Sequence, residues 1–434
     1  MNLGSEIREV AKKAANLLLK HDFARIYTHY DADGIAGGAI VAKALLRAGK
    51  SFQISFLKGL NDFELEGDEL LIFVDMGSGY SEKISSIDSN VIILDHHKPD
   101  GEIKPKKTLV HLNPHLFGVD GTYELSASGA AYFFARELGN NRDLASIAIL
   151  GAIGDKQKFL GLNGEILMDG VNSGCLEVRR GISLPSGKLS RSLAMSIEPY
   201  LDFYGKEDEL REFLKRAGLE DKEFDELSAS ELQRLADAIA LRLLKLGAYE
   251  GVFEQVIGKI VLVKNLPVRN SSYLVDIINS CGRLGATSTA FSILLGDEKA
   301  LREGIEIEER FKREILEELA KRRNDIREGF CIRYLVMDDA PSTSSIATVF
   351  SRYLMPDKPL VVLNVKKDGN VKVSARTTEK IARKLDLAEV MRMSAKKVGG
   401  VGGGHRVAAG ANIRKENLEE FLKEVDRLCC AMLA

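Results

Sequence analysis

The stretch THYDADGIAGG, Thr28 to Gly38, places His29, Asp31 and Asp33 at alternate positions just before two glycines. It follows the apolar run RIYTH and precedes a helical pattern near Ile35, so it is predicted to join a strand to a helix. Residues two apart on an extended segment face the same side. The three side chains can therefore converge on one centre, although an Asx-rich turn that caps the helix explains the same letters.

Four further apolar runs resemble this first strand, and helical stretches separate them. Their near-continuous apolar character is typical of strands buried on both faces, as in a parallel α/β sheet. The glycines after the first strand are expected to let backbone come close to backbone. The five predicted strands are RIYTH (25–29), FQISFL (52–57), LLIFVDM (70–76), VIILDHH (91–97) and TLVHLNP (108–114).

Acids and imidazoles stand where several of these elements end. Asp75 closes IFVD, Asp95, His96 and His97 close VIILDHH, and Asp155 ends the helical run LASIAILGAIGD. In parallel α/β sheets, sites form beyond the carboxyl ends of the strands. Taken singly, each residue has an ordinary explanation as a loop acid, a helix-end residue or a structural histidine. Their common position at one sheet edge favours one shared site.

The chemistry of this set indicates metal. Carboxylates and imidazoles without thiolates favour Mn²⁺ or Mg²⁺ over structural zinc. So many carboxylates cannot stay ionised together unless cations offset their repulsion. The pattern therefore predicts a two-metal centre.

The rest of the chain predicts a helical region and a second α/β domain. Residues 196–247 show apolar spacings of three and four, and Ser228 with Glu231 fits a capping box. Residues 305–329 indicate one long charged helix, a spacer between domains. From Ile332 strands return, with a hairpin turn at Asp368–Gly369. The predicted domains are 1–195, 196–329 and 330–434.

The last domain carries features suited to an anionic partner. The stretch VGGVGGGHRVAAGANI, 398–413, is interpreted as a glycine-rich loop whose N–H groups can approach an anion, and Ser374 and Arg376 lie on the arm of the predicted hairpin. Between Lys366 and Lys415 stand 13 basic residues against four acidic ones, a local charge of +9. A polyanion suits this segment, while counter-charges elsewhere in the fold are the alternative.

Composition limits the class of protein. The 434 residues carry a net charge of −2, which argues against a uniformly basic nucleic-acid binder. No apolar run approaches the roughly 18 residues of a membrane helix, and the N-terminus lacks signal-peptide character, so a cytoplasmic protein is expected. The five cysteines show no CxxC or finger-like spacing and are expected as reduced thiols: Cys175, Cys281, Cys331, Cys429 and Cys430.

Five motifs resemble those of the DHH phosphoesterases with a DHHA1 domain, and they follow one another along the chain in the order of that family. Three stretches between them are similar to the archaeal RecJ-like (GAN-like) branch: 163–174, 205–219 and NSCGRLGATSTAFSILLGDEKA (279–300). The resemblance therefore covers nearly the whole chain. The five motifs are HYDADG (29–34), FVDMG (73–77), DHH (95–97), GAIGD (151–155) and GGGHRVAAG (402–410).

The resemblance implies a fold and a set of roles. A parallel-sheet DHH domain, a helical middle region and a smaller mixed α/β DHHA1 domain that faces the first across a cleft are expected. Two Mn²⁺ ions, with Mg²⁺ as the alternative, are implied, bridged by Asp75. Asp95 would orient His96, and His97 would contact the scissile phosphate. The implied metal set is His29, Asp31, Asp33, Asp75, His96 and Asp155, and the implied substrate set is Ser374, Arg376, Gly403, Gly404 and His405.

The leading functional hypothesis is an exonuclease that hydrolyses single-stranded DNA or RNA by a two-metal mechanism. An alternative with the same chemistry is a phosphodiesterase for short oligonucleotides or cyclic dinucleotides, or a nucleotide phosphatase. A replisome scaffold of the same fold is the alternative outside enzymes, and replisome proteins are candidate partners in either case.

Overall fold

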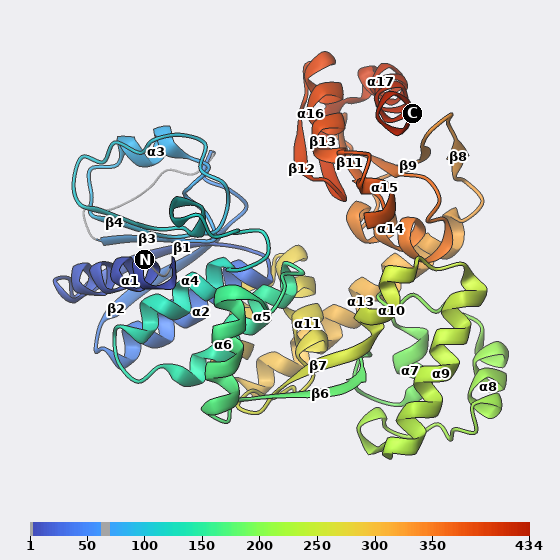
Figure 1. Cartoon of the computed structure of the whole chain (residues 1–434), viewed down its shortest axis with the longest axis horizontal. Helices are drawn as coiled ribbons and strands as arrows, with labels where there is room; N and C mark the ends of the chain where they lie inside the picture. The colour runs from blue at the N-terminus through green and yellow to red at the C-terminus, as the bar shows by residue number, and fades with distance from the viewer. Residues whose placement is uncertain (1–2, 62–69) are drawn as a thin grey trace. The chain divides into compact units, whose positions relative to one another are not determined.

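The computed structural model describes residues 3–61 and 70–434, which form two compact units (Figure 1). Each unit combines two separate segments of chain: residues 1–179 with 259–308, and residues 180–258 with 309–434. The predicted boundaries 1–195, 196–329 and 330–434 follow chain order, and they do not separate segment 259–308 from the middle region. Long-range packing places this segment in the first unit.

The first unit contains a parallel sheet and the helices around it. Its elements are α1 (Leu3–Leu19), β1 (Phe23–His29), α2 (Ala32–Arg47), β2 (Ser51–Leu57), β3 (Leu70–Val74), α3 (Ser81–Ser86), β4 (Val91–Leu94), β5 (Leu109–Leu112), α4 (Ala127–Arg136), α5 (Ala145–Gly154), α6 (Gly161–Asn172), α11 (Ser271–Arg283) and α12 (Thr287–Leu295). Three elements contain the unit boundaries: β6 (Leu176–Ile182), β7 (Ile257–Val263) and α13 (Glu298–Arg322).

The sheet has the order β2-β1-β3-β4-β5, and every neighbouring pair is parallel. All five predicted strands are confirmed. Burial on both faces is confirmed for β3 and β4 and is wrong for β2, whose residues are exposed or half-buried. The reason is its place at the edge of the sheet, which sequence alone does not assign.

Alternate residues of β3 enter different cores on the two faces of the sheet. Leu70, Ile72 and Val74 pack in the large core with α1, α2 and α4, whereas Leu71 and Phe73 pack in a smaller core with α3. Figure 1 shows these helices on opposite faces. A Cβ at Gly37 of α2 would lie 2.5 Å from Val74 Cγ1, so this glycine lets the helix approach the sheet, as predicted.

The second unit contains the helical region and a six-stranded sheet. Its remaining elements are α7 (Leu189–Ala194), α8 (Glu207–Arg216), α9 (Ala229–Leu246), α10 (Phe253–Val256), β8 (Arg327–Glu328), β9 (Arg333–Asp338), α14 (Thr343–Val349), β10 (Leu360–Val365), β11 (Asn370–Arg376), α15 (Glu379–Ala382), α16 (Leu387–Lys397), β12 (Val401–His405), β13 (Ala408–Arg414) and α17 (Leu418–Leu433). The capping box of Ser228 and Glu231 at α9 is confirmed. The long helix α13 begins at Glu298 because Asp297 accepts the N–H of Lys299 at 2.8 Å.

The six-stranded sheet has the order β12-β13-β11-β10-β9-β8, with β9 and β10 parallel and the other pairs antiparallel. The hairpin at Asp368–Gly369 is confirmed as the β10–β11 turn. The predicted glycine-rich loop over 398–413 is wrong, because most of this stretch forms the β12–β13 hairpin. Glycine has low strand propensity, so the pattern indicated a turn; the cross-strand hydrogen bonds to β13 outweigh that preference.

The cysteines differ from the prediction in one pair. Cys331 and Cys430 form a disulfide with Cα atoms 5.3 Å apart, so reduced thiols were the wrong prediction for these two. They lie 99 residues apart in sequence, and only the packing of α17 beside the start of β9 brings them together. Cys175, Cys281 and Cys429 are free and buried. Among the described residues, no helix has an apolar stretch long enough to cross a membrane.

Candidate metal centre

The predicted ligands lie together at the edge of the parallel sheet where the carboxyl ends of its strands meet. His29 is the last residue of β1, Asp75 directly follows β3, and Asp95 directly follows β4. The strand order changes direction between β1 and β3, and in such sheets the crevice at this switch point binds ligands. Asp155 reaches the same place from the C-terminal end of α5.

The two aspartates of HYDADG are held by helix N-termini. Asp31 is the N-cap of α2 and accepts the Gly34 N–H at 3.1 Å. Asp33 is fully buried and accepts the backbone N–H groups of Ala127 at 2.7 Å and Ser128 at 3.0 Å, at the start of α4. Because N–H donors and a helix N-terminus both favour negative charge, these contacts orient the buried carboxylate of Asp33.

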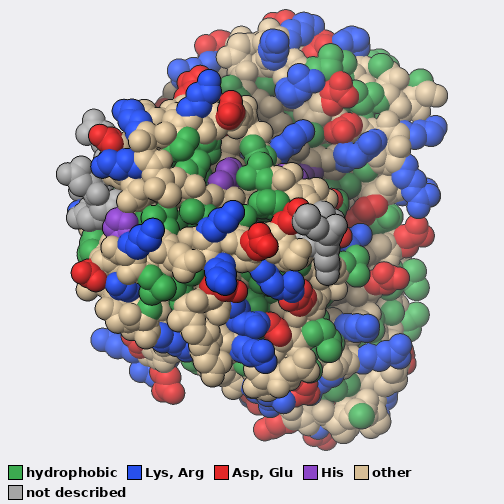
Figure 2. All heavy atoms as spheres, turned by 60° about the vertical axis from the view of Figure 1, so that its left-hand side comes forward, with side chains coloured by type: hydrophobic (Ala, Val, Ile, Leu, Met, Phe, Trp, Pro, Cys, Tyr) green, Lys and Arg blue, Asp and Glu red, His purple; other side chains and the backbone are tan. Residues whose placement is uncertain are grey.

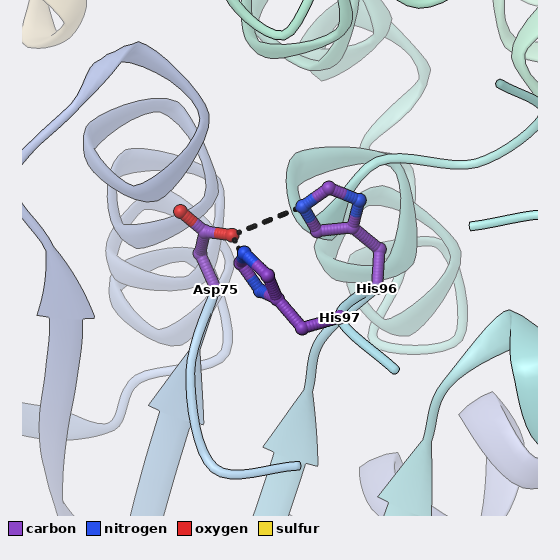
Figure 3. Close-up of side chains that lie close together, drawn as sticks. All are labelled: Asp75, His96 and His97. Carbon is purple, nitrogen blue, oxygen red and sulfur yellow. Dashed lines mark ion pairs between the residues drawn. The ribbon is translucent and has the colours of Figure 1, made fainter. Parts of the chain in front are cut away.

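Asp75 lies at the middle of the cluster, and its two oxygens face different neighbours. Its Oδ2 lies 3.4 Å from His29 Nδ1. Its Oδ1 lies 3.3 Å from His96 Nε2 and 3.6 Å from His97 Nδ1 (Figure 3). The backbone of Asp75 adopts a φ of 58°, a left-handed conformation that is uncommon for residues other than glycine and that is found at functional sites.

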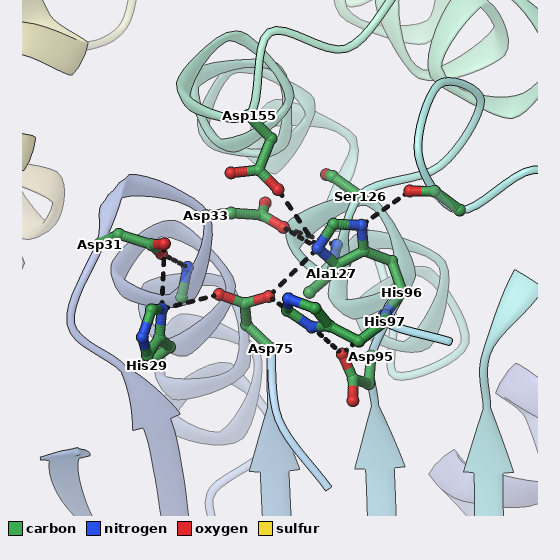
Figure 4. A network of polar contacts seen from close by, with 12 residues as sticks. His29, Asp31, Asp33, Asp75, Asp95, His96, His97, Ser126, Ala127 and Asp155 are labelled. Atoms are coloured by element: carbon green, nitrogen blue, oxygen red, sulfur yellow. Dashed lines mark hydrogen bonds and ion pairs between the residues drawn. The ribbon is translucent and has the colours of Figure 1, made fainter. Parts of the chain in front are cut away.

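Two sets of ligand atoms flank Asp75, as Figure 4 shows. On one side His29 Nδ1 lies 2.9 Å from Asp31 Oδ2. On the other side His96 Nε2 lies 3.2 Å from Asp155 Oδ2 and 3.8 Å from Asp33 Oδ2. Within each of three trios the ligand atoms lie inside 4.8 Å of one another: His29, Asp31 and Asp75; Asp33, His96 and Asp155; and Asp75, His96 and His97.

The electrostatics of the cluster favour added positive charge. Burial raises the pKa of Asp33, and the charge of Asp75 raises it further, to about 6. Burial also raises the pKa of Asp75, as does the charge of Asp31. Burial lowers the pKa of His29, but hydrogen bonds and attraction from Asp31 and Asp75 outweigh it and raise this pKa to about 11. Asp33 and Asp75 therefore resist ionising together, and the His29 imidazole holds a proton that a cation would replace.

Two buried polar atoms test whether the residues fit divalent cations. Asp75 Oδ1 and His96 Nε2 are buried and have no hydrogen-bond partner. Such atoms cost free energy unless something satisfies them. The two atoms lie 3.3 Å apart and face each other in Figure 4, and both are atom types that bind Mn²⁺ or Mg²⁺. The donor set therefore fits two cations with Asp75 between them.

The ring of His96 is held by residues that the motifs did not indicate. Its Nδ1 lies 2.7 Å from the carbonyl oxygen of Gly121, which only accepts, so Nδ1 carries a hydrogen and, in the neutral ring, Nε2 has the lone pair that a metal would need. Gln157 donates to the same carbonyl at 2.8 Å, and Asn163 donates to Gln157 Oε1 at 2.7 Å. In the sequence, Gln157 stands two residues beyond Asp155, and that adjacency was its one signal.

The side chain of Asp95 holds the ring of His97 and not that of His96. The resemblance implied that Asp95 orients His96, but its Oδ1 accepts His97 Nδ1 at 2.9 Å and receives from His96 only the backbone N–H, at 2.8 Å. Burial lowers the pKa of His97, and the hydrogen bond and charge of Asp95 raise it to about 9. The His97 side chain is 56% exposed, so its remaining nitrogen is accessible from solvent.

The predicted substrate residues of the C-terminal domain come from neighbouring strands. The register aligns Ser374 of β11 with Gly410 of β13, and Gly410 with Gly403 of β12; likewise Arg376, Ala408 and His405 share a row. Because opposed residues and residues two apart share a face, Ser374, Arg376, Gly403 and His405 belong to one face of the sheet.

The residues on this face differ in how much open space lies above them. A Cβ at Gly403 would meet no atom within 4 Å, and His405 is exposed, whereas Ser374 is only 5% exposed. Gly404 belongs to the opposite face, where a Cβ would lie 2.7 Å from Ala409 Cα, and it adopts a φ of +135°. Gly404 therefore permits the backbone conformation of β12 and its close packing on β13, whereas its neighbour Gly403 leaves open space on the face that it shares with Ser374.

Part of the local positive charge is balanced by acids outside the segment. Asp339 lies 3.0 Å from Lys366 and 3.6 Å from Lys367, and Glu424 lies 2.8 Å from Lys397. In Figure 2 lysine and arginine side chains are interspersed with acidic ones across the visible face. The segment 366–415 is thus less basic in the fold than its sequence count indicates.

Comparisons with known proteins agree with this arrangement. The model of the DHH family, N-terminal domain, matches residues 24–154, and the model of the DHHA1 domain matches residues 329–430. The uncharacterized protein MJ0831 of Methanocaldococcus jannaschii is 32% identical over 444 residues, which cover 98% of this chain and 97% of that protein.

Two solved structures show the same fold at lower identity. RecJ from Thermus thermophilus, in complex with Mn²⁺, is 19% identical with a TM-score of 0.62; the match covers 98% of this chain and 55% of that one, so this chain spans about half the length of that RecJ. CDC45 from Entamoeba histolytica is 13% identical with a TM-score of 0.64, covering 98% and 99%. From the ordered domains and the full-length relative, the chain belongs to the DHH family and carries a C-terminal DHHA1 domain.

Proposed function

We propose that this protein is a metal-dependent exonuclease that hydrolyses phosphodiester bonds of single-stranded DNA, RNA or both. The observation that carries the proposal is the position of Asp75, whose two oxygens face two separate sets of ligand atoms. A pair of cations sharing one carboxylate is an arrangement suited to in-line displacement at phosphorus. The likeness to RecJ in complex with Mn²⁺ supports Mn²⁺ as the ion, with Mg²⁺ as the alternative.

The residues have distinct roles in this proposal. Two divalent cations would lower the pKa of a bound water and stabilise both the entering and the leaving oxygen. His29 and Asp31 would hold one cation, Asp33, His96 and Asp155 would hold the other, and Asp75 would bridge them. His97, held by Asp95 through Nδ1, would donate a hydrogen bond from its exposed side to the scissile phosphate.

The C-terminal sheet would hold the strand by its backbone. Gly403 leaves space for a phosphate to approach the β12 backbone, while Arg376 and His405 supply positive or donor groups on the same face. An arginine fork can contact phosphate with two hydrogen bonds, which a lysine does less well. Binding of this type tracks the phosphate chain and weakens with salt.

The direct test is digestion of one single-stranded DNA and one matched RNA, each labelled at either end, with Mn²⁺ or with excess chelator. We expect stepwise, metal-dependent release of mononucleotides, and the labelled end that is lost first gives the polarity. Cleavage confined to very short oligomers would instead support an oligonucleotide phosphodiesterase.

A replisome scaffold is a second candidate, and the likeness to CDC45 over 98% of the chain favours it. A scaffold has no need of a full ligand set, whereas every predicted ligand of this chain is present at one sheet edge. Absence of cleavage on all substrates, together with Mn²⁺ binding too weak to measure, would favour the scaffold.

A further inference from the structure

The motif NSCGRLG, 279–285, lies far in sequence from the predicted metal ligands, yet in the fold it touches the residues on either side of Asp31, in the connection between β1 and α2. It covers the last turns of α11 and the residues after them. Asn279 Oδ1 accepts the backbone N–H of Ala32 at 3.0 Å. The two residues are 247 positions apart, so this contact exists only because segment 259–308 packs in the first unit.

A second contact lies one turn further along the same helix. Gly282 faces Tyr30, and a Cβ at this position would collide with the Tyr30 carbonyl oxygen. Residues three apart lie on one face of a helix, so Asn279 and Gly282 meet the loop side by side. One contact lies just before Asp31 in the chain and the other just after it.

The hydrogen bond satisfies a specific need at the start of α2. The first N–H groups of a helix have no partner within the helix. Asp31, the N-cap, accepts from Gly34 and not from Ala32. Asn279 accepts the Ala32 N–H, a group that the N-cap side chain does not reach, while Asp31 Oδ2 lies 2.9 Å from His29 Nδ1.

We infer that Asn279 and Gly282 are positioning residues, which hold the Asp31 loop in the geometry that binds the first cation of the pair. This inference rests on the proposed function for the identity of the ion. It assigns a role to the motif 279–285 of segment 259–308. It also makes the metal site depend on the correct docking of α11 against the connection between β1 and α2.

The test compares two asparagines at opposite ends of α11. Asn270 caps the start of the helix by accepting the Tyr273 N–H at 3.1 Å, and it lies about 13 Å along the helix axis from Asn279. Asn270→Ala and Asn279→Ala each remove one side-chain acceptor, so both are expected to lower Tm. Only Asn279→Ala is expected to weaken Mn²⁺ binding, by roughly the 10- to 100-fold seen when a partner of a metal ligand is lost.

Binding is measured on the full chain by titration calorimetry with Mn²⁺ and by the rise of Tm with Mn²⁺ concentration, with no nucleic acid present. Asn279→Asp keeps the acceptor oxygen and is expected to bind close to wild type. Gly282→Ala is expected to weaken binding at least as much as Asn279→Ala if it folds, and Asn279→Ala decides the question if it does not.

The outcomes separate this inference from the proposed function. Equal Mn²⁺ affinity in wild type and Asn279→Ala would overturn the positioning role and leave the exonuclease proposal standing. Equal weakening by Asn270→Ala would also overturn it, because the effect would then come from general loss of stability. A wild-type protein that fails to bind Mn²⁺ would overturn the metal centre itself.

Discussion

The metal edge of the first unit and the glycine face of the second differ in how each is built. At the metal edge, carboxylates and imidazoles form trios whose ligand atoms lie within 4.8 Å of one another, and helix N-termini and a backbone carbonyl orient some of them. On the glycine face, three antiparallel strands place Ser374, Gly410 and Gly403 in one row, and a Cβ at Gly403 would meet no atom within 4 Å. The first region depends on charges that need partners, whereas the second depends on the absence of side chains.

This difference predicts different sensitivities. Removing one group from a buried, charged cluster leaves others unsatisfied, so single changes there should have large effects. The glycine face offers an extended strand several separate contacts, so single changes there should be milder. The four predictions that follow test this contrast, beginning with the largest expected effect.

Asp75→Asn should abolish the bridge between the two ligand sets. Loss of several kcal/mol of charge stabilisation by metal corresponds to about a 10³-fold or greater fall in kcat, at about 1.4 kcal/mol per factor of ten. The measurement is single-turnover cleavage with saturating Mn²⁺. Asp88→Asn, an exposed acid of the same unit paired with Lys107, is the matched control and should cleave normally. Robust cleavage by Asp75→Asn would exclude a shared carboxylate.

Gln157→Leu should release the ring of His96, because the Gly121 carbonyl loses one of its two donors and Asn163 loses its acceptor. Roughly 10- to 100-fold weaker Mn²⁺ binding is expected, as measured by calorimetry. Gln233→Leu changes an exposed glutamine that contacts Asp237 and serves as the control. An unchanged Mn²⁺ affinity would mean that the buried cluster holds His96 without this partner.

Arg376→Ala should weaken single-strand binding without changing Mn²⁺ affinity. Loss of one phosphate contact should lower the slope of log K against log salt by about 1, measured by fluorescence anisotropy with labelled oligonucleotide. Lys423→Ala on α17, a helix that packs in the core of the opposite sheet face, is the control. Identical salt slopes for wild type and Arg376→Ala would remove Arg376 from the strand surface.

The metal-free protein should lose stability as pH rises. The pKa of His29 is raised to about 11 and that of His97 to about 9, so each contributes stability that is fully present below the unfolded value of about 6.5 and is lost as pH rises towards its folded value. Water screens the exposed His97, so its share should be below about 1 kcal/mol.

The measurement is urea unfolding of chelator-treated protein at pH 6 and pH 9.5, with His97→Gln for comparison. The free energy of unfolding should fall between these pH values, and it should fall less in the variant. Added Mn²⁺ should restore stability most at the higher pH, because fewer protons then compete for the ligands. A fall of the same size in His97→Gln would show that His97 contributes nothing to it.

Much of the fold and the metal set could be predicted from local sequence signals. The five parallel strands, the turn at Asp368–Gly369 and the capping box at Ser228 follow from apolar periodicity and from residues whose preferences act over a few positions. The proposed metal ligands could be named because they stand near the ends of elements, and parallel strands bring those ends together at one edge.

Other features were decided by packing between distant segments. The tertiary structure alone showed that Asn279 meets Ala32, that Gly121 holds the ring of His96, and that Cys331 pairs with Cys430. The same is true of the glycine-rich stretch, which forms paired strands because β13 lies beside it. Propensity and periodicity reflect interactions between residues a few positions apart. The contacts named above depend instead on how whole helices and strands pack, and the burial of many side chains at once determines that packing.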